Sequence, residues 1–392
     1  MTVGVVATVL GLAACSSNGA QGPAQPTQTE QKVSPAAVSK PAKVTQIPGD
    51  TAQNVSPVDP VQVMVADGAL TDVHLVNDHG REVTGLVSPD KHTWTATESL
   101  GYGRSYTWSG TALGADGKQV PLGGTFHTLS PARQISAQIN IADSAIVGVA
   151  EPIVLTFSAP VQDKASVERA LTVQSTNPAP GSWAWLDDKT LHYRTKDYWP
   201  ANTKVTLLAK LYGTSFGNGA YGAEDLSLNF TVGRSLVMRG NTQTHHLQVF
   251  QDGNMIADYP ASYGLDSDPG RVTNSGTHIV MSKSATFSMS NPKYHYENVV
   301  VPWAVRISNN GEFIHGYAPS IWAQGNTNVS HGCVNLAPAN AQIVYNEVLP
   351  GDPVEVTGST EQLGPEDGDY YDWAVGWVDP VTSTGSPGST SL

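Results

Sequence analysis

Short runs in which apolar and polar side chains alternate constrain this chain more than any other sequence feature. The clearest runs lie at 61–65, 72–76, 92–96 and 105–110, and turn-forming clusters separate them at 66–68, 77–80, 88–90 and 115–117. Successive side chains of a β-strand point to opposite faces, so this period predicts half-buried strands. Strands separated by turns about every ten residues are typical of a β-sandwich. The 38 Gly, 26 Pro and only 14% charged residues agree with a turn-rich, mainly β chain.

The same pattern occurs twice along the chain. Residues 59–65 are echoed by 151–157, and residues 123–128 are echoed by 227–233. We therefore expect two immunoglobulin-like β-sandwiches, at 59–130 and 131–233, each near the usual size of such a domain. The second copy adds a short helical candidate at 163–171. Neither copy contains a cysteine, so both must be stabilised by their apolar cores.

A third β domain is expected at 234–358. A hairpin with an Asp252-Gly253 turn is predicted at 245–264, and further strands are predicted at 276–282, 304–309, 311–316 and 352–356. One short helix is expected after Cys333, because apolar side chains recur on one helical face at Ala337, Ala341, Val344 and Val348. An extension at 359–392 follows, and we expect its last residues to be disordered. Its aromatic residues should dock on a domain rather than lie in water; they are Tyr370, Tyr371, Trp373 and Trp377.

The N-terminal stretch indicates export. Residues 3–14 are apolar and uncharged, and Cys15 follows directly in the sequence Leu-Ala-Ala-Cys. The stretch is too short to span a bilayer but has the length of a signal-peptide core. It resembles a bacterial lipobox over 1–15, which implies lipid on Cys15, a place at the outer face of the cytoplasmic membrane, and a Ser/Pro/Gln-rich flexible tether at 16–58. The alternative is an ordinary cleaved signal with an incidental cysteine.

The charge balance excludes one class of partner. The formal net charge is −13 and no basic run occurs. Nucleic acid is therefore excluded as a partner, and so is an anionic lipid surface as a docking site for the folded domains.

The other cysteine, Cys333, lies in the sequence Ser-His-Gly-Cys-Val-Asn. It can be a buried inert side chain, a zinc ligand together with His315 and His331, or a nucleophile. An exported, unpaired thiol beside His and Gly favours the nucleophile. His331 stands two residues before Cys333, so an extended backbone would place both side chains on one face. Gly332 frees the backbone to point N–H groups at a developing oxyanion.

Residues 313–335 as a whole resemble the signature of the L,D-transpeptidases of bacterial cell walls, and the mycobacterial lipoprotein members also carry immunoglobulin-like domains. The signature is a His, a gap, and then Ser/Thr-His-Gly-Cys-apolar-Asn. Here His315 and Ser330 are separated by residues 316–329.

The resemblance implies a role for each matching residue. Cys333 would be the nucleophile and His315 its base, with Gly316 in place of a serine that follows the His in relatives. The N–H groups of Gly332 and Cys333 would hold the oxyanion. Residues that would shape the site or contact substrate are His331, Ser330 and Asn335. Residues 279–303 resemble the active-site lid of these enzymes, and we expect substrate-facing side chains at Met289, Tyr294, Tyr296 and Trp322.

The implied activity is acyl transfer between peptidoglycan stems. A tetrapeptide donor would lose D-Ala to form a Cys333 thioester, and the side-chain amine of a second stem would complete a 3→3 cross-link. The resemblance implies no metal or cofactor, a monomeric enzyme, and carbapenem-type β-lactams as covalent inhibitors. Two alternatives remain open: an L,D-carboxypeptidase of the same fold, and a non-catalytic wall-binding lipoprotein.

Overall fold

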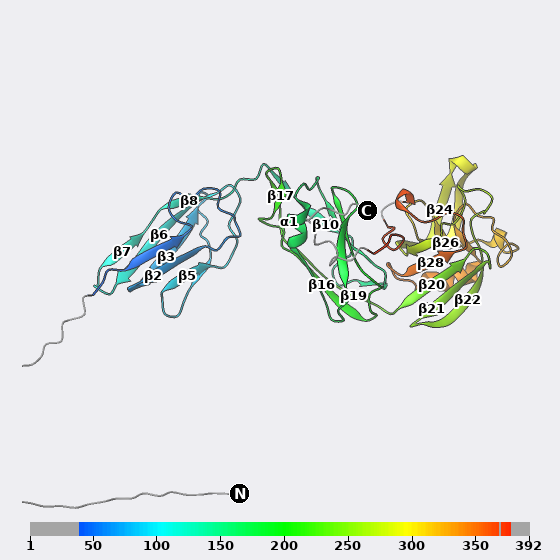
Figure 1. The fold of residues 1–392 in the computed structure, drawn as a ribbon, viewed down its shortest axis with the longest axis horizontal. Coiled ribbons are helices and arrows are strands. Elements are labelled where there is room, and N and C mark those ends of the chain that lie inside the picture. Colours follow the sequence, from blue (N-terminus) through cyan, green and yellow to red (C-terminus); the bar gives the residue numbers. More distant parts are fainter. Residues whose placement is uncertain (1–38, 368–369, 378–392) are drawn as a thin grey trace, which may run out of the picture.

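Three β domains follow one another in a row in the computed structural model, which describes residues 39–367 and 370–377 (Figure 1). Residues 1–15 with Cys15, most of the expected tether, and the end of the extension lie outside the described residues. Strands dominate throughout, as predicted. Among the described residues, no helix is long and apolar enough to cross a membrane.

The first domain is a sandwich of two antiparallel sheets. One has the order β1-β2-β5-β4 and the other the order β3-β6-β7, with β8 also paired to β6. The core between them contains Trp94 and Trp108, whose ring centroids are 5.6 Å apart. The strands are β1 (Lys43–Ile47), β2 (Gln62–Ala66), β3 (Gly68–Asn77), β4 (Gly85–Val87), β5 (Thr93–Ala96), β6 (Ser105–Gly114), β7 (Gln119–Leu122) and β8 (Thr125–His127).

The expected tether is wrong at its C-terminal end. Strand β1 lies inside the range 16–58 and pairs along its whole length with β2, from Lys43 opposite Ala66 to Ile47 opposite Gln62. The chain then stays on this domain, since the Val55 N–H donates to the His127 carbonyl. The first sandwich therefore begins before residue 59. Strand β1 has only a weak sequence pattern of its own. It is stabilised by backbone hydrogen bonds to β2, a strand that the sequence does predict.

The second domain is also a sandwich, with sheets in the order β10-β12-β15-β14 and β11-β19-β16-β13 and a small sheet β17-β18-β9. Its core contains Phe157 stacked on Trp185 at 5.5 Å. Its helix, α1 (Lys164–Arg169), begins where Asp163 accepts a hydrogen bond from the Ser166 N–H. The strands are β9 (Arg133–Ile135), β10 (Ala137–Ile139), β11 (Ile146–Val147), β12 (Ile153–Phe157), β13 (Leu171–Ser175), β14 (Gly181–Trp185), β15 (Thr190–Thr195), β16 (Thr203–Ala209), β17 (Ser215–Gly217), β18 (Ala220–Gly222) and β19 (Leu226–Val232).

The third domain is built on a nine-stranded sheet in the order β23-β28-β20-β21-β22-β27-β26-β25-β24. The helix α2 (Pro338–Glu347) buries Ala341 and Val344, as its spacing predicts. At the turn between β21 and β22, Asp252 and Gly253 have φ of 50° and 81°, as a type I′ hairpin turn requires. The strands are β20 (Leu236–Asn241), β21 (His246–Gln251), β22 (Asn254–Ser262), β23 (Gly276–Ile279), β24 (Ser282–Asn291), β25 (Tyr296–Arg306), β26 (Phe313–Gly316), β27 (Val334–Leu336) and β28 (Pro353–Thr357).

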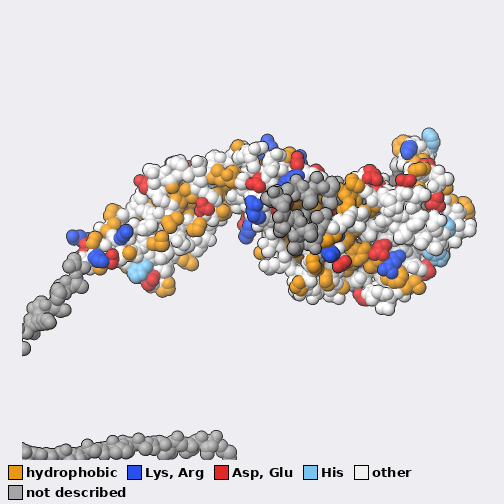
Figure 2. Space-filling model, in the orientation of Figure 1, with side chains coloured by type: hydrophobic (Ala, Val, Ile, Leu, Met, Phe, Trp, Pro, Cys, Tyr) orange, Lys and Arg blue, Asp and Glu red, His pale blue; other side chains and the backbone are white. Residues whose placement is uncertain are grey.

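Three short 3-10 helices complete the third domain and the extension: η1 (Pro292–Tyr294), η2 (Ala318–Ser320) and η3 (Pro365–Asp367). The hairpin of β24 and β25, closed by η1, projects from the sheet (Figure 1, yellow). On the face shown in Figure 2, basic side chains are scattered among acidic ones and form no continuous basic surface.

The C-terminal extension returns to the second sandwich, which confirms that its aromatic residues dock. The Trp373 indole N–H donates to the Ala150 carbonyl at 2.8 Å. The Arg194 guanidinium lies over the rings of Trp373 and Trp377, at 4.8 and 5.2 Å from their centroids. A few residues earlier, Asp367 contacts the third domain, so the extension touches both domains.

Candidate active site

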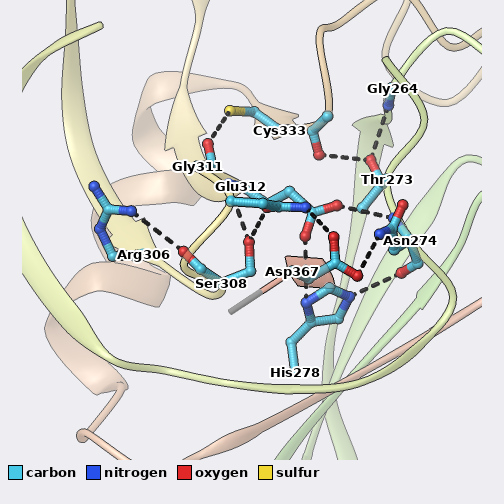
Figure 3. Close-up of polar contacts among 12 residues, drawn as sticks. Gly264, Thr273, Asn274, His278, Arg306, Ser308, Gly311, Glu312, Cys333 and Asp367 are labelled. Carbon is cyan, nitrogen blue, oxygen red and sulfur yellow. Dashed lines mark hydrogen bonds and ion pairs between the residues drawn. The ribbon is translucent and has the colours of Figure 1, made fainter. Parts of the chain in front are cut away.

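Cys333 lies immediately before β27, where the chain enters the sheet. Its side chain is 9% exposed and packs in a small apolar cluster with Val301, Ala304 and Phe313. Met289 of the projecting hairpin packs against this cluster. The thiol points to the Gly311 carbonyl, with Sγ 3.9 Å from the oxygen (Figure 3). Cys333 is the free cysteine of the described residues, and it lies where the hairpin and the sheet meet.

His315 comes from β26, the neighbouring strand. Strands β26 and β27 are parallel and place Ile314 opposite Val334 and His315 opposite Asn335. Asn335 therefore lies beside His315 on the same face of the sheet. Side chains two residues apart share a face in an extended chain, and Cys333 comes two residues before Asn335. The His315 Nδ1 atom lies 3.1 Å from the Gly316 carbonyl oxygen. A carbonyl can only accept, so Nδ1 carries the proton and Nε2 is left as the basic atom.

Both groups are held neutral before substrate arrives. Burial lowers the pKa of His315 to about 4, and the hydrogen bond to the Gly316 carbonyl opposes this only in part. Burial likewise raises the pKa of the Cys333 thiol to about 12, and the nearby Glu312 acts in the same direction. At neutral pH the resting site therefore contains a thiol and an uncharged imidazole.

Three hydrogen bonds fix the backbone of the Cys333 loop. The Ser330 hydroxyl donates to the Cys333 carbonyl at 2.6 Å and accepts from the Gly332 N–H at 3.2 Å. The Thr273 hydroxyl donates to the Gly332 carbonyl at 2.7 Å (Figure 3). Gly332 has a φ of 112°, which side chains other than hydrogen rarely allow. Of the two amides expected to hold an oxyanion, that of Gly332 is thus already bonded to Ser330.

A buried polar network lies behind this loop (Figure 3). One Glu312 carboxyl oxygen accepts from the Asn274 N–H at 2.8 Å, and the other lies 3.5 Å from Nδ1 of His278. The His278 Nε2 donates to the Asn274 carbonyl at 2.8 Å. Asp367 of the extension accepts from the side chains of Asn274 and Asn310. The loops before and behind Cys333 are therefore tied together through side chains.

Glu312 and His278 face each other in the interior. Both side chains are buried, and His278 Nδ1 lies 3.5 Å from Glu312 Oε2. Burial raises the pKa of Glu312, and the facing His278 opposes this in part. These two facing atoms have no hydrogen-bond partner among the described residues.

The projecting hairpin covers the other side of the loop. The rings of Tyr294 and Tyr296 each lie 5.1 Å from the ring of His331. His331 itself is exposed. Burial lowers the pKa of His331, and the Arg271 cation acts in the same direction.

The His and Cys side chains of the site can be compared with the ligand groups that a metal ion needs. In the described part of the chain, no group of three or more His, Cys, Asp or Glu residues is placed to hold a metal ion. His315, His331 and Cys333 in particular do not form such a group. What the site does offer is one thiol, one imidazole with a free nitrogen, and a rigid loop.

Comparison with known proteins identifies the same family that the signature at 313–335 predicts. The L,D-transpeptidase catalytic domain family matches residues 237–356, and the bacterial Ig domain family matches residues 52–215. L,D-transpeptidase 5 of Mycobacterium tuberculosis is 47% identical over 88% of this chain and 77% of the relative. L,D-transpeptidase 2 of the same species is 34% identical over 95% of this chain and 92% of the relative.

The chain belongs to the L,D-transpeptidase family.

A solved structure supports this assignment at the level of the fold. An LD transpeptidase in complex with imipenem superposes with a TM-score of 0.50 at 30% identity, covering 58% of this chain and 100% of the other. The present chain is thus an L,D-transpeptidase, an acyltransferase of the cell wall, with immunoglobulin-like domains before its catalytic domain. The resemblance of residues 313–335 to the family signature is confirmed.

Gly316 answers how this L,D-transpeptidase holds its histidine without a following serine. Its carbonyl binds His315 Nδ1 directly. A Cβ atom at Gly316 would lie 3.0 Å from Pro338 Cα and 3.1 Å from Pro302 Cγ, so the position is too tight for a side chain unless its neighbours move. The hydrogen bond that orients the imidazole here comes from the main chain, and the ring of Tyr317 lies edge-on to it at 6.0 Å.

The prediction that His331 and Cys333 share one face is wrong. Residues 331 and 332 form a bend rather than a strand, and the positive φ of Gly332 reverses the local direction of the chain. Cys333 therefore turns into the apolar cluster, whereas His331 turns out to the lid tyrosines. The two histidines expected near the thiol lie in different surroundings.

Of the other residues expected at the site, most lie at the loop or the lid. Ser330 and Asn335 are buried beside Cys333 and His315, respectively. Trp322 is 69% exposed and stacks on no other ring of the described residues. The prediction did not include Thr273, Asn274, His278, Glu312 or Arg271. Of these five residues, only Glu312 stands out in the sequence, because it is a charged residue at the start of a mainly apolar strand.

Proposed function

We propose that this L,D-transpeptidase forms 3→3 peptidoglycan cross-links, with Cys333 as the nucleophile and His315 as its base. One observation carries the proposal. A buried imidazole stands on β26 and a buried thiol stands immediately before the neighbouring strand β27, and the Gly316 carbonyl commits Nδ1 of the imidazole so that only Nε2 can accept a proton. The Cys333–His315 pair has the composition of an activated nucleophile.

Acylation begins when a donor tetrapeptide places its third-residue carbonyl against Sγ. The thiol proton moves to His315 Nε2 as the S–C bond forms, and the negative charge falls on the carbonyl oxygen. The candidate hydrogen-bond donor to this oxygen is the backbone N–H of Cys333 itself. Collapse breaks the C–N bond, and the imidazolium returns the proton to the departing amine of D-Ala. A thioester on Cys333 and free D-Ala remain.

Transfer reverses the sequence with a second stem. Its side-chain amine gives a proton to His315 Nε2 and attacks the thioester carbonyl, and the C–S bond breaks. The thiolate regains the proton from the imidazolium, which restores the resting pair. A thioester suits both halves because a thiolate is a good nucleophile and a good leaving group. Water in place of the amine would give the carboxypeptidase reaction, so product analysis with and without acceptor separates the two.

A β-lactam should acylate the same thiol. The similar LD transpeptidase was solved in complex with imipenem, which supports carbapenem-type β-lactams as covalent inhibitors of this chain. In the test, purified protein is incubated with disaccharide-tetrapeptide or with imipenem. We expect dimeric products and a mass adduct on Cys333, and neither in Cys333→Ala. Dimer formation by Cys333→Ala, or an adduct elsewhere, would contradict the proposal.

We also propose that Cys15 carries lipid and anchors a monomeric enzyme at the outer face of the cytoplasmic membrane. The apolar stretch at 3–14 followed by Cys15 supports this. The described domains, arranged in a row, would then act as a spacer that carries Cys333 away from the membrane. The intact mass of native protein tests the proposal: we expect a chain that begins at Cys15 and carries lipid, and an unlipidated mature chain that keeps Cys15 would contradict it.

A further inference from the structure

Three hydrogen-bond donors gather on the lid side of Cys333. They are the side chains of Arg271, from the loop before β23, and of Lys293 and Tyr294, from η1. The Arg271 guanidinium lies 5.9 Å and the Lys293 ammonium 4.9 Å from the centroid of the Tyr294 ring. A Cβ atom on Gly270 would lie 2.4 Å from the Tyr294 hydroxyl and 2.8 Å from Lys293 Nζ. The polar ends of Lys293 and Tyr294 therefore lie against the loop that carries Arg271.

These donors are not used up by the protein. Arg271 donates from Nε and Nη2 to the carbonyls of Val329 and Ser330, at 2.7–3.2 Å. Its Nη1 and the Lys293 ammonium donate to no acceptor in the described part of the chain. The Tyr294 hydroxyl is buried and has no hydrogen-bond partner there either. Leaving a buried hydroxyl unpaired is unfavourable, so an acceptor from outside would be stabilising at this place.

One carboxylate lies beside these donors, that of Asp268. Its Oδ1 lies 3.5 Å from the position that a Cβ atom on Gly270 would take, and it accepts from the Gly270 N–H at 3.1 Å. It forms no ion pair with either cation within the described residues. The chain as a whole has a formal charge of −13, so two unpaired cations beside one another stand out against its average charge. Such a local field attracts an anion.

The cluster lies beside the nucleophile. Arg271 holds the carbonyl of Ser330, which begins the loop that ends at Cys333. Burial raises the pKa of the Tyr296 phenol. Cys333 raises this pKa further and the Arg271 cation lowers it, so the phenol lies within electrostatic reach of both residues. Tyr294 and Tyr296 contact the same His331 ring. An anion bound by the three donors would sit at the edge of the space in front of Sγ.

We propose that Arg271, Lys293 and Tyr294 form a carboxylate-binding subsite that takes the C-terminal carboxylate of the acyl donor. An arginine fork, an ammonium and a hydroxyl match the two oxygens of a carboxylate. That the bound carboxylate belongs to the acyl donor rests on the proposed function. That these three side chains prefer an anion does not. In a tetrapeptide the terminal carboxylate stands one residue, about 3.5 Å, beyond the carbonyl that Cys333 attacks. Holding it would bring that carbonyl to the thiol and leave D-Ala poised to depart.

The test compares charged and neutral partners of Cys333. Iodoacetate and iodoacetamide both alkylate a thiolate, forming an S–C bond and releasing iodide, but only iodoacetate carries a carboxylate. Two donor stems, one with a free terminal carboxylate and one with a terminal carboxamide, make the same comparison for turnover. The variants are Arg271→Gln and Lys293→Gln. Lys189→Gln is the charge-matched control, since Lys189 is exposed on the second sandwich.

We expect each variant to lower the iodoacetate-to-iodoacetamide rate ratio by about tenfold, the size of one charge-assisted hydrogen bond, and Lys189→Gln to leave it unchanged. The ratio of kcat/KM for the acid and amide stems should fall in parallel, mainly through KM. The iodoacetamide rate alone reports whether the loop is intact, and Lys293→Gln leaves the Arg271 bonds to the loop in place.

Equal ratios in wild type, both variants and the control would overturn the subsite. If wild type turns over neither stem but still prefers iodoacetate, the proposed function fails and the subsite stands. If it turns over both stems equally and shows no alkylation preference, the subsite fails and the function stands. A further donor stem has an amidated terminus but keeps a carboxylate at another position. If it reacts like the acid stem, the bound carboxylate is the one at that other position.

Discussion

The wall of the site behind Cys333 and the wall in front of it differ in burial and in the use of their polar groups. Behind the loop, Glu312, His278 and Asn274 are buried and contact one another through two hydrogen bonds and one ion-pair contact at 3.5 Å, although Glu312 Oε2 and His278 Nδ1 have no hydrogen-bond partner among the described residues. In front, Tyr294 and Lys293 are carried by a projecting hairpin, and their donors have no acceptor within the described residues.

The two histidines of the site follow this division. His315 is 4% exposed, and its ring is fixed by the Gly316 carbonyl. His331 is exposed and contacts only the lid tyrosines among the aromatic rings described. Under the proposed function, the buried His315 handles the proton, while the exposed front wall contacts what approaches the thiol. A linear motif that contains both histidines does not separate these roles.

The largest expected effect comes from exchanging the two histidines for an uncharged amide. His315→Gln should lower kcat/KM for cross-linking by about 10²–10⁴-fold, the usual contribution of a general base. His331→Gln should cost less than tenfold, because it removes a ring contact and not the base. Circular dichroism and the melting temperature of both variants check that neither has simply unfolded.

The pH profile sharpens the same comparison. The pKa of His315 is lowered to about 4, so the base is neutral above that pH and activity should fall only as the pH drops through about 4. His331→Gln should keep this acid limb where it is. An acid limb near the ordinary histidine value of about 6.5, or one that moves in His331→Gln, would assign the base to His331 instead.

A smaller effect is expected from breaking the rear wall while leaving both histidines of the motif in place. Glu312→Leu leaves the Asn274 N–H and His278 Nδ1 without their partner, which should cost about 3–5 kcal/mol of unfolding free energy and slow the alkylation of Cys333. Glu312→Gln can accept from Asn274 and donate to His278, so it should keep both stability and reactivity. Denaturant unfolding and iodoacetamide kinetics measure the two. Equal losses in the Gln and Leu variants would contradict a role for the Glu312 contacts in supporting the loop.

Much of the fold follows from local pattern. The alternating runs identify β2, β5 and β6 within a few residues, and the helical spacing identifies α2. Strand β1 escapes because it is short, flanked by Pro and Ala, and stabilised by pairing with β2, some twenty residues further on. A strand that depends on its partner for its hydrogen bonds leaves little trace in its own sequence.

At the site, the residues joined by a linear motif were predictable and those joined by tertiary contacts were not. Cys333 and His315 stand in one signature, and the structure places His315 on β26 and Cys333 immediately before the neighbouring strand β27. The pairing of Glu312 with His278 depends on how separate strands pack. The orientation of His331 was mispredicted because a single backbone angle, at Gly332, decides it.

The C-terminal extension also sets how small an active piece of this enzyme can be. Asp367 ties the loops behind Cys333, and the next described residues, through Trp373, are fastened to the second sandwich. A fragment cut after β28 would contain every residue of the family signature yet lose one support of its nucleophile loop. A fragment lacking the second sandwich would leave the indole of Trp373 in water. We therefore expect that the smallest fragment keeping both contacts of the tail contains the second sandwich, the third domain and the tail.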